Sequence, residues 1–127
     1  MRKDVKNWLE QSKKDYENAE KNFELNEYYL TAFLVQQSVE KALKGYYIQK
    51  KKKFVGKTHS LVYIGSELKM PENLLTELRK INPDFIYTRY PDMEGVPPYK
   101  AYDKKIAKER LKSGNKVLKW IKKQINQ

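Results

Sequence analysis

The residues best suited to bind an anion lie in the segment 85–92, which reads Phe-Ile-Tyr-Thr-Arg-Tyr-Pro-Asp. Arg89 lies between Tyr87 and Tyr90, and Asp92 follows it by three positions. A guanidinium donates paired hydrogen bonds to a phosphate, and tyrosine adds a hydroxyl donor and a ring that stacks on a base. The segment therefore indicates a phosphate or nucleotide site. An equally simple interpretation is that Arg89 pairs with Asp92 or with a helix carboxylate and only fixes the loop.

A second polar group follows helical spacing. Gln37, Glu40, Lys41 and Lys44 are three or four residues apart and therefore share one side of a helix. Such a side is usually solvated and held by pairs such as Glu40 with Lys44. The same stretch also carries a wide apolar arc, so a buried polar network between Gln37 and Glu40 is the second interpretation.

His59 is the only histidine, and imidazole is the side chain that titrates near neutral pH. No residue beside it in the sequence suits the activation of a nucleophile. The favoured interpretation is structural: His59 caps or hydrogen-bonds the turn before a short helix. A catalytic interpretation requires the fold to bring His59 and an arginine together.

The overall charge predicts an anionic partner, which could be nucleic acid, a nucleotide phosphate, an acidic protein face or a membrane surface, and composition does not choose among them. The 127 residues include 27 Lys and Arg against 16 Asp and Glu, a net charge of +11. Arginine occurs only at positions 2, 79, 89 and 110, so most of this charge belongs to lysine, which attracts anions diffusely. The lysine run at 50–53 would attract a polyanion in a salt-sensitive way, although such a run is more often a helix end facing water.

The composition also excludes several kinds of site. The absence of cysteine excludes disulfides, thiolate catalysis and cysteine-based zinc sites, and a single histidine excludes a multi-histidine metal site. We therefore predict no metal and no cofactor. No apolar run reaches the ~18–20 residues of a membrane span, and the first residues begin an amphipathic pattern rather than a signal sequence. The expected location is the cytoplasm, with no membrane partner.

The apolar periodicity predicts an all-α protein. Long helices are expected at about 4–25, 27–51 and 101–125, and two short ones at about 61–68 and 71–81. Asn26 is expected to cap the second long helix, whose wide apolar arc indicates that it is covered on two sides. The proline-rich segment 82–99 shows no regular period and is predicted to be a functional loop. The expected fold is one domain, residues 1–127, an up-and-down helical bundle of three long and two short helices.

Three stretches resemble the HEPN domain family: Ala-Phe-Leu-Val-Gln-Gln-Ser-Val-Glu-Lys-Ala-Leu-Lys at 32–44, Lys-Thr-His-Ser-Leu at 57–61 and Tyr-Thr-Arg-Tyr-Pro-Asp at 87–92. They occur in the family's order, and the resemblance covers nearly the whole chain. It implies a helical bundle, commonly dimeric, that often acts beside a minimal nucleotidyltransferase in a toxin–antitoxin-like pair. It also implies a nucleotide-binding cleft. With Lys44 from the polar side, the predicted ligand-binding residues are Gln37, Glu40, Lys44, His59, Arg89, Tyr90 and Asp92.

Some members of that family are metal-independent RNases that carry an Arg followed, after four to six residues, by a His. In this chain no histidine follows Arg89. The resemblance therefore argues against this RNase mechanism. We assign no catalytic residue and favour a protein without enzyme activity, with an RNase that uses a divergent site kept as an alternative.

Three functions remain, in order of preference. The first is a binding module, a homodimer that acts with a nucleotidyltransferase partner and holds a nucleotide or phosphate, with Arg89 on the phosphate and Tyr90 stacking or donating. The second is a structural partner without a ligand. The third is an RNase acting on RNA through a divergent site, in which His59 is the base and Arg89 stabilises the pentavalent phosphate.

Overall fold

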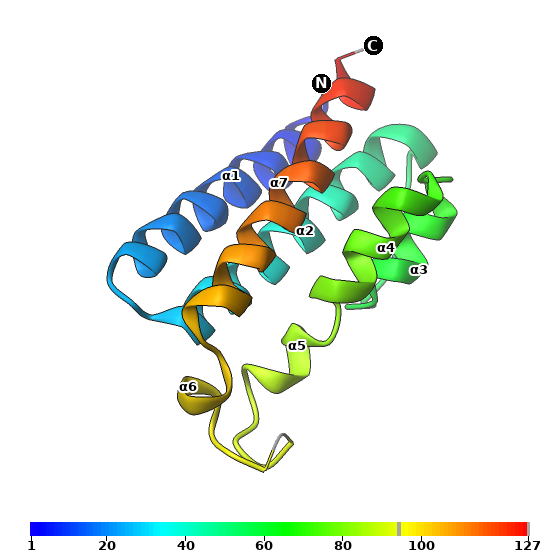
Figure 1. Cartoon of the computed structure of the whole chain (residues 1–127). Coiled ribbons are helices and arrows are strands. Elements are labelled where there is room, and N and C mark those ends of the chain that lie inside the picture. Colours follow the sequence, from blue (N-terminus) through cyan, green and yellow to red (C-terminus); the bar gives the residue numbers. More distant parts are fainter. Residues whose placement is uncertain (94, 127) are drawn as a thin grey trace.

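The computed structural model describes residues 1–93 and 95–126, and every regular element within them is a helix. The bundle is built from α1 (Lys3–Glu24), α2 (Tyr28–Lys51), α4 (Glu72–Ile81) and α7 (Lys104–Ile125), which pack side by side (Figure 1). The predicted all-α helical bundle is confirmed. No helix in this part of the chain is long and apolar enough to cross a membrane.

Three shorter helices complete the described structure. α3 (Leu61–Glu67) packs on α2 and α4, while α5 (Asp84–Tyr87) and α6 (Pro98–Ala101) are single turns that contact α2. α3 and α4 are the two short helices that the periodicity predicts. The turns α5 and α6 lie inside the segment 82–99 or at its end, which the sequence analysis treats as irregular; four residues are too few for an apolar period to be visible.

The chain runs up and down through the four main helices. Ser12 Oγ on α1 donates to Ser38 O on α2 at 2.6 Å, and Thr31 Oγ1 donates to Ala19 O at 3.2 Å, so these two helices are antiparallel. The Tyr46 ring packs edge-on against Trp120 at 5.9 Å between centroids. The C-terminal ends of α2 and α7 therefore lie at the same side of the bundle as both chain termini (Figure 1).

The turn between α1 and α2 differs from the expectation. Asn26 does not cap α2; it takes a left-handed conformation with φ 61° and ends α1. The backbone N–H of Glu27 donates to Asn22 O at 2.9 Å, and that of Asn26 donates to Phe23 O at 3.0 Å. This pair of bonds is a Schellman motif, in which asparagine tolerates the left-handed position better than most residues do. The sequence prediction was wrong because asparagine suits both ends of a helix.

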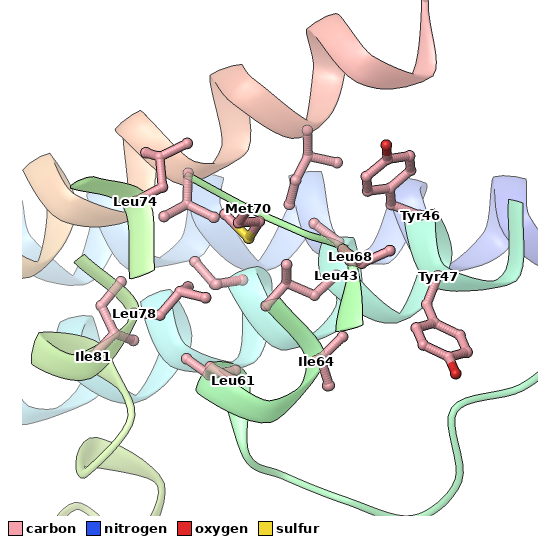
Figure 2. Packing of buried hydrophobic residues seen from close by; sticks show 14 of the residues in the cluster. Leu43, Tyr46, Tyr47, Leu61, Ile64, Leu68, Met70, Leu74, Leu78 and Ile81 are labelled. Carbon is pink, nitrogen blue, oxygen red and sulfur yellow. The ribbon is translucent and has the colours of Figure 1, made fainter. Parts of the chain in front are cut away.

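The core lies where α2, α3, α4 and α7 face one another (Figure 2). Leu43 of α2, Leu61 and Ile64 of α3, and Leu78 and Ile81 of α4 are fully buried. α1 covers the other side of α2, which confirms that the wide apolar arc is covered on two sides. Burial of such side chains from several helices is the main force that holds a bundle of this size together.

Two details set how closely α7 packs. A Cβ at Gly114 would lie 2.7 Å from Val35 Cγ1, so only glycine allows α7 this near to α2. On its other side, the Ser113 hydroxyl donates to Glu77 of α4 at 3.1 Å. Burial raises the pKa of the Glu77 carboxyl, but its hydrogen bonds and the positive charge of nearby lysines lower that pKa by more. The carboxylate is therefore charged at neutral pH and joins α4 to α7.

Candidate functional site

A row of polar side chains lies buried along α2. Gln36, Glu40 and Lys44 are spaced four residues apart, and they are 0%, 6% and 4% exposed. Gln36 Nε2 donates to Glu40 Oε1 at 3.0 Å, and Lys44 Nζ donates to Glu40 Oε2 at 3.2 Å. The predicted pair of Glu40 with Lys44 is present, but it belongs to a buried network rather than to a solvated face.

The glutamine in contact with Glu40 is not the predicted one. Gln37 is only half-buried, and its Nε2 donates to Gln36 Oε1 at 2.7 Å. Gln37 therefore reaches Glu40 through Gln36. Lys41, on the same predicted side, pairs instead with Asp15 of α1. Lys41 faces α1, whereas Glu40 faces His59 in the loop before α3. The spacing of α2 alone does not show which neighbouring segment covers which side of the helix.

His59 completes this network from the loop before α3. Ser60 caps α3 by accepting from the Tyr63 N–H at 3.2 Å, and the Leu61 N–H donates to Asn82 Oδ1 at 2.7 Å. These bonds hold the loop against the end of α4. His59 Nδ1 then lies 3.1 and 3.2 Å from the two carboxylate oxygens of Glu40. With a proton on Nδ1 donated to Glu40, neutral His59 presents Nε2 as an acceptor.

The predicted role of His59 is thus only partly seen. Its side chain does hydrogen-bond, but to Glu40, which lies 19 positions earlier in the sequence, and not to its own turn. The side chain is 50% exposed. One edge of the imidazole is therefore fixed by a buried carboxylate, while the rest of the ring remains accessible to a ligand.

Phe85 of α5 connects His59 with Arg89. The His59 and Phe85 rings are stacked, with centroids 4.0 Å apart and 17° between their planes. The Arg89 guanidinium carbon lies 4.3 Å from the Phe85 centroid and 5.4 Å from that of Phe33 on α2. Cations at these distances are attracted by the face of an aromatic ring. Arg89 is therefore held against α2 by aromatic contacts.

The guanidinium of Arg89 makes no ion pair with any carboxylate in residues 1–93 and 95–126. The alternative interpretation, a pair between Arg89 and Asp92, is not observed. Tyr90 and Asp92 lie on the exposed part of the same segment, and neither side chain forms a hydrogen bond or ion pair within that range. The structure brings Gln37, Glu40, Lys44, His59 and Arg89 into one connected cluster and leaves Tyr90 and Asp92 at its edge.

A buried carboxylate anchors the segment that carries Phe85 and Arg89. Asp84 is 1% exposed, and its carboxylate accepts from Arg110 Nε of α7 at 2.6 Å and from the Tyr102 hydroxyl at 2.7 Å. Thr88 Oγ1 also donates to the backbone oxygen of Asp84. One residue therefore ties α5 to α7 and to the end of α6. This anchor was not predictable from local spacing, because Tyr102 and Arg110 are 18 and 26 positions from Asp84.

Phe85 and Gln36 were also missed, and a signal existed for each. Gln36 continues the four-residue spacing of Glu40 and Lys44, and Phe85 is the aromatic residue four positions before Arg89. By contrast, the cavity of about 560 Å³ between α1 and α7 is lined by none of the predicted ligand-binding residues. In the described part of the chain no group of acidic and histidine side chains is arranged to hold a metal ion.

The cluster therefore offers a guanidinium without a counter-ion among the described residues, an imidazole oriented by a carboxylate, and an aromatic ring between them. These groups are suited to hold an anion such as a phosphate, because charge-assisted hydrogen bonds from arginine are among the strongest that a protein surface forms.

The family model for the HEPN domain matches residues 5–124, and the chain belongs to the HEPN domain family. Two solved structures resemble it over nearly their whole lengths. TT1696 from Thermus thermophilus is 27% identical with a TM-score of 0.86, over 94% of this chain and 96% of that one. ST0689, described as an archaeal HEPN homologue, is 30% identical with a TM-score of 0.83, over 98% and 99%. A comparison with the curated proteins found no match.

A third solved structure shares the fold. The HEPN domain protein TM0613 from Thermotoga maritima is 19% identical with a TM-score of 0.75, over 95% of this chain and 98% of that one.

Proposed function

We propose that this protein is a binding module that holds the phosphate group of a nucleotide at Arg89. The observation that supports this most directly is the state of the Arg89 guanidinium: it rests on the Phe85 and Phe33 rings, and no carboxylate of the described residues neutralises it. A ring face holds the planar group without using its N–H donors. The donors are then available to a phosphate.

Neighbouring groups fit the rest of a nucleotide. His59 presents its accessible ring beside Phe85, and Tyr90, 52% exposed, adds an aromatic face and a hydroxyl. In this proposal His59 and Tyr90 contact the sugar or base, while Glu40, Lys44 and Gln37 hold the site in shape and do not reach the ligand directly. No metal and no cofactor take part.

Arg89→Ala is expected to weaken nucleotide binding roughly 10- to 100-fold, the effect of losing a charge-assisted hydrogen bond. Isothermal titration calorimetry with a panel of nucleoside mono- and triphosphates measures it. Arg79→Ala, which removes an exposed arginine that pairs with Glu72 on α4, is the matched control and is expected to bind as the wild type does. If the wild type binds no nucleotide, or if both variants lose affinity equally, the proposal is wrong.

The same proposal includes a homodimer that acts with a minimal nucleotidyltransferase in the cytoplasm. This part of the proposal is supported by where the exposed hydrophobic side chains lie. Of the nine large ones among the described residues, five lie between 86 and 99. These are Ile86, Tyr90, Met93, Val96 and Tyr99. Exposed hydrophobic side chains that are grouped in one segment favour a protein–protein contact at that segment.

Tyr99→Glu is therefore expected to weaken self-association, because it places a charge on a segment that the second chain would cover. Sedimentation equilibrium should show the mass of two chains for the wild type and a shift towards one chain for the variant. Leu25→Glu is the matched control, since Leu25 is similarly exposed (70% against 65% for Tyr99) but lies at the end of α1. A monomeric wild type, or equal effects of both variants, would remove the dimer from the proposal. If the protein is instead a structural partner without a ligand, the wild type will form a dimer but will bind no nucleotide in the calorimetric titration.

A second candidate function is an RNase, and one observation favours it. The Glu40–His59 pair orients an imidazole as in general base sites, and Phe85 brings that imidazole and Arg89 onto one ring. RNA cleavage by the purified protein that is lost in both His59→Ala and Arg89→Ala would support it. Cleavage that survives His59→Ala would point to a contaminating enzyme or to a mechanism that does not use His59.

A further inference from the structure

The positive charge of this protein is concentrated at one end of the bundle. Residues 41–66 contain seven lysines and no acidic residue, and residues 110–126 contain six basic residues and no acidic residue. These stretches include the ends of α2 and α7, which lie together with both termini (Figure 1). At the other end, residues 17–27 contain four glutamates and one lysine. The net charge of +11 is therefore polarised along the bundle.

We name as the basic end the exposed lysines at the ends of these two helices: Lys50, Lys51, Lys52, Lys53, Lys119, Lys122 and Lys123. None of them forms an ion pair with a carboxylate in the part of the chain that the structure describes. Helix dipoles do not account for so many cations, because each helix C-terminus carries only roughly half a negative charge. Most of this charge is therefore available to an external anion.

An aromatic residue beside the basic end is held in a position suited to stacking. Phe54 follows the lysine run, and its ring stacks on Trp8 of α1 with centroids 6.0 Å apart and planes at 24°. Lys44 Nζ lies 5.9 Å from the Phe54 centroid and 5.8 Å from that of Trp8. Phe54 is nevertheless 50% exposed. The Trp8 contact fixes the orientation of the Phe54 ring, and its exposed side leaves room for a nucleic-acid base to stack on it.

We propose that the basic end binds single-stranded nucleic acid, with backbone phosphates on its lysines and a base stacked on Phe54. Lysine attracts phosphates without regard to sequence, and a fixed aromatic ring accepts any base. The single fixed ring favours nucleic acid over an anionic membrane, since membrane binding uses an amphipathic helix or several inserted side chains. The inference does not depend on nucleotide binding at Arg89, which mononucleotides test separately.

The test measures the fluorescence anisotropy of a labelled oligouridylate at several salt concentrations. One variant carries glutamine at the basic end, and its control carries glutamine at the same number of exposed lysines at the start of α7. The first is Lys50→Gln, Lys51→Gln and Lys53→Gln; the second is Lys104→Gln, Lys105→Gln and Lys108→Gln. Both lower the net charge equally.

The basic-end variant is expected to bind roughly 10-fold or more weakly, and its slope of log affinity against log salt should fall by about 2, since each phosphate contact to a single strand contributes ~0.7. The control is expected to bind nearly as the wild type does. Phe54→Leu should weaken binding roughly 5- to 100-fold, and Phe54→Trp should restore it. Circular dichroism of each variant verifies that it is folded.

Several outcomes would overturn the inference. Equal losses in the two lysine variants would show that only net charge matters. Unchanged binding in Phe54→Leu would show that no base stacks on Phe54. Equal affinity for a duplex would show that the basic end does not prefer single strands. Binding to vesicles that contain phosphatidylserine, without binding to the oligonucleotide, would assign the basic end to a membrane instead.

Discussion

Glu40→Ala is expected to lower the free energy of unfolding by about 3–5 kcal/mol, the usual cost of removing one partner of a buried ion pair. The Lys44 side chain is only 5% exposed, so its ammonium group would remain buried without a carboxylate. Gln36 and His59 would lose their acceptor at the same time. Urea unfolding followed by far-UV circular dichroism measures the change.

Glu72→Ala is the matched control for this result. Glu72 pairs with Arg79 at 2.7 Å, but the two side chains are 73% and 50% exposed. A pair in that position contributes less than about 1 kcal/mol, because water already solvates both charges. If the Glu40 and Glu72 variants were equally stable, the row on α2 would not be a buried network in solution.

The double variant Glu40→Leu with Lys44→Met separates stability from function. Replacing both charges by apolar groups avoids an unpaired buried charge, so it should be less destabilised than Glu40→Ala. If nucleotide binding is nevertheless lost in a stable double variant, the role of the row is to orient His59 and not to hold the bundle together.

The fold could be predicted from the sequence because its signals are local and repeated. α2 and α7 follow a helical apolar period over more than twenty residues, and chance interruptions do not hide a pattern of that length. The first turn of α3 was also predictable, since Ser60 is a strong N-cap residue. Asn26 shows the limit, because one residue type suits two opposite roles and only the backbone decides between them.

The candidate site was predictable only as a set of residue types. Glu40 and Lys44 lie one helical turn apart, so their pairing follows from spacing alone. His59 has no partner in its own segment, and its contacts with Glu40 and Phe85 exist only because α2, the loop before α3 and α5 converge. Gln36, and not Gln37, is the buried glutamine that contacts Glu40. Which of the two is buried depends on where the neighbouring segments lie and not on the sequence of α2.

Asp84→Ala is expected to have a comparably large effect, about 3–5 kcal/mol, for a different reason. The Asp84 carboxylate is almost fully buried and accepts from both Arg110 and Tyr102. Its removal leaves the Arg110 guanidinium, which is 19% exposed, without this carboxylate. Asp84→Asn keeps the shape of the side chain but not its charge. Its free energy of unfolding should therefore lie between those of Asp84→Ala and the wild type, and well below that of the wild type.

Asp92→Ala provides the control within the same segment. Asp92 is exposed, and substitutions at such positions usually change stability by less than about 0.5 kcal/mol. Similar losses in Asp84→Ala and Asp92→Ala in urea unfolding would contradict the role of Asp84 as the anchor of the segment.

The Asp84 variants also test whether this anchor positions the proposed phosphate site. Asp84 immediately precedes Phe85, the ring on which Arg89 rests. Hydrogen–deuterium exchange is therefore expected to increase in the amides of 85–90 before the bundle unfolds, because these residues lose their tie to α7 while the core is unchanged. Nucleotide affinity should fall with it, although Asp84 contacts no ligand. If exchange in 85–90 increased and nucleotide affinity did not change, binding would not depend on the position of Arg89, and the phosphate site would have to lie elsewhere.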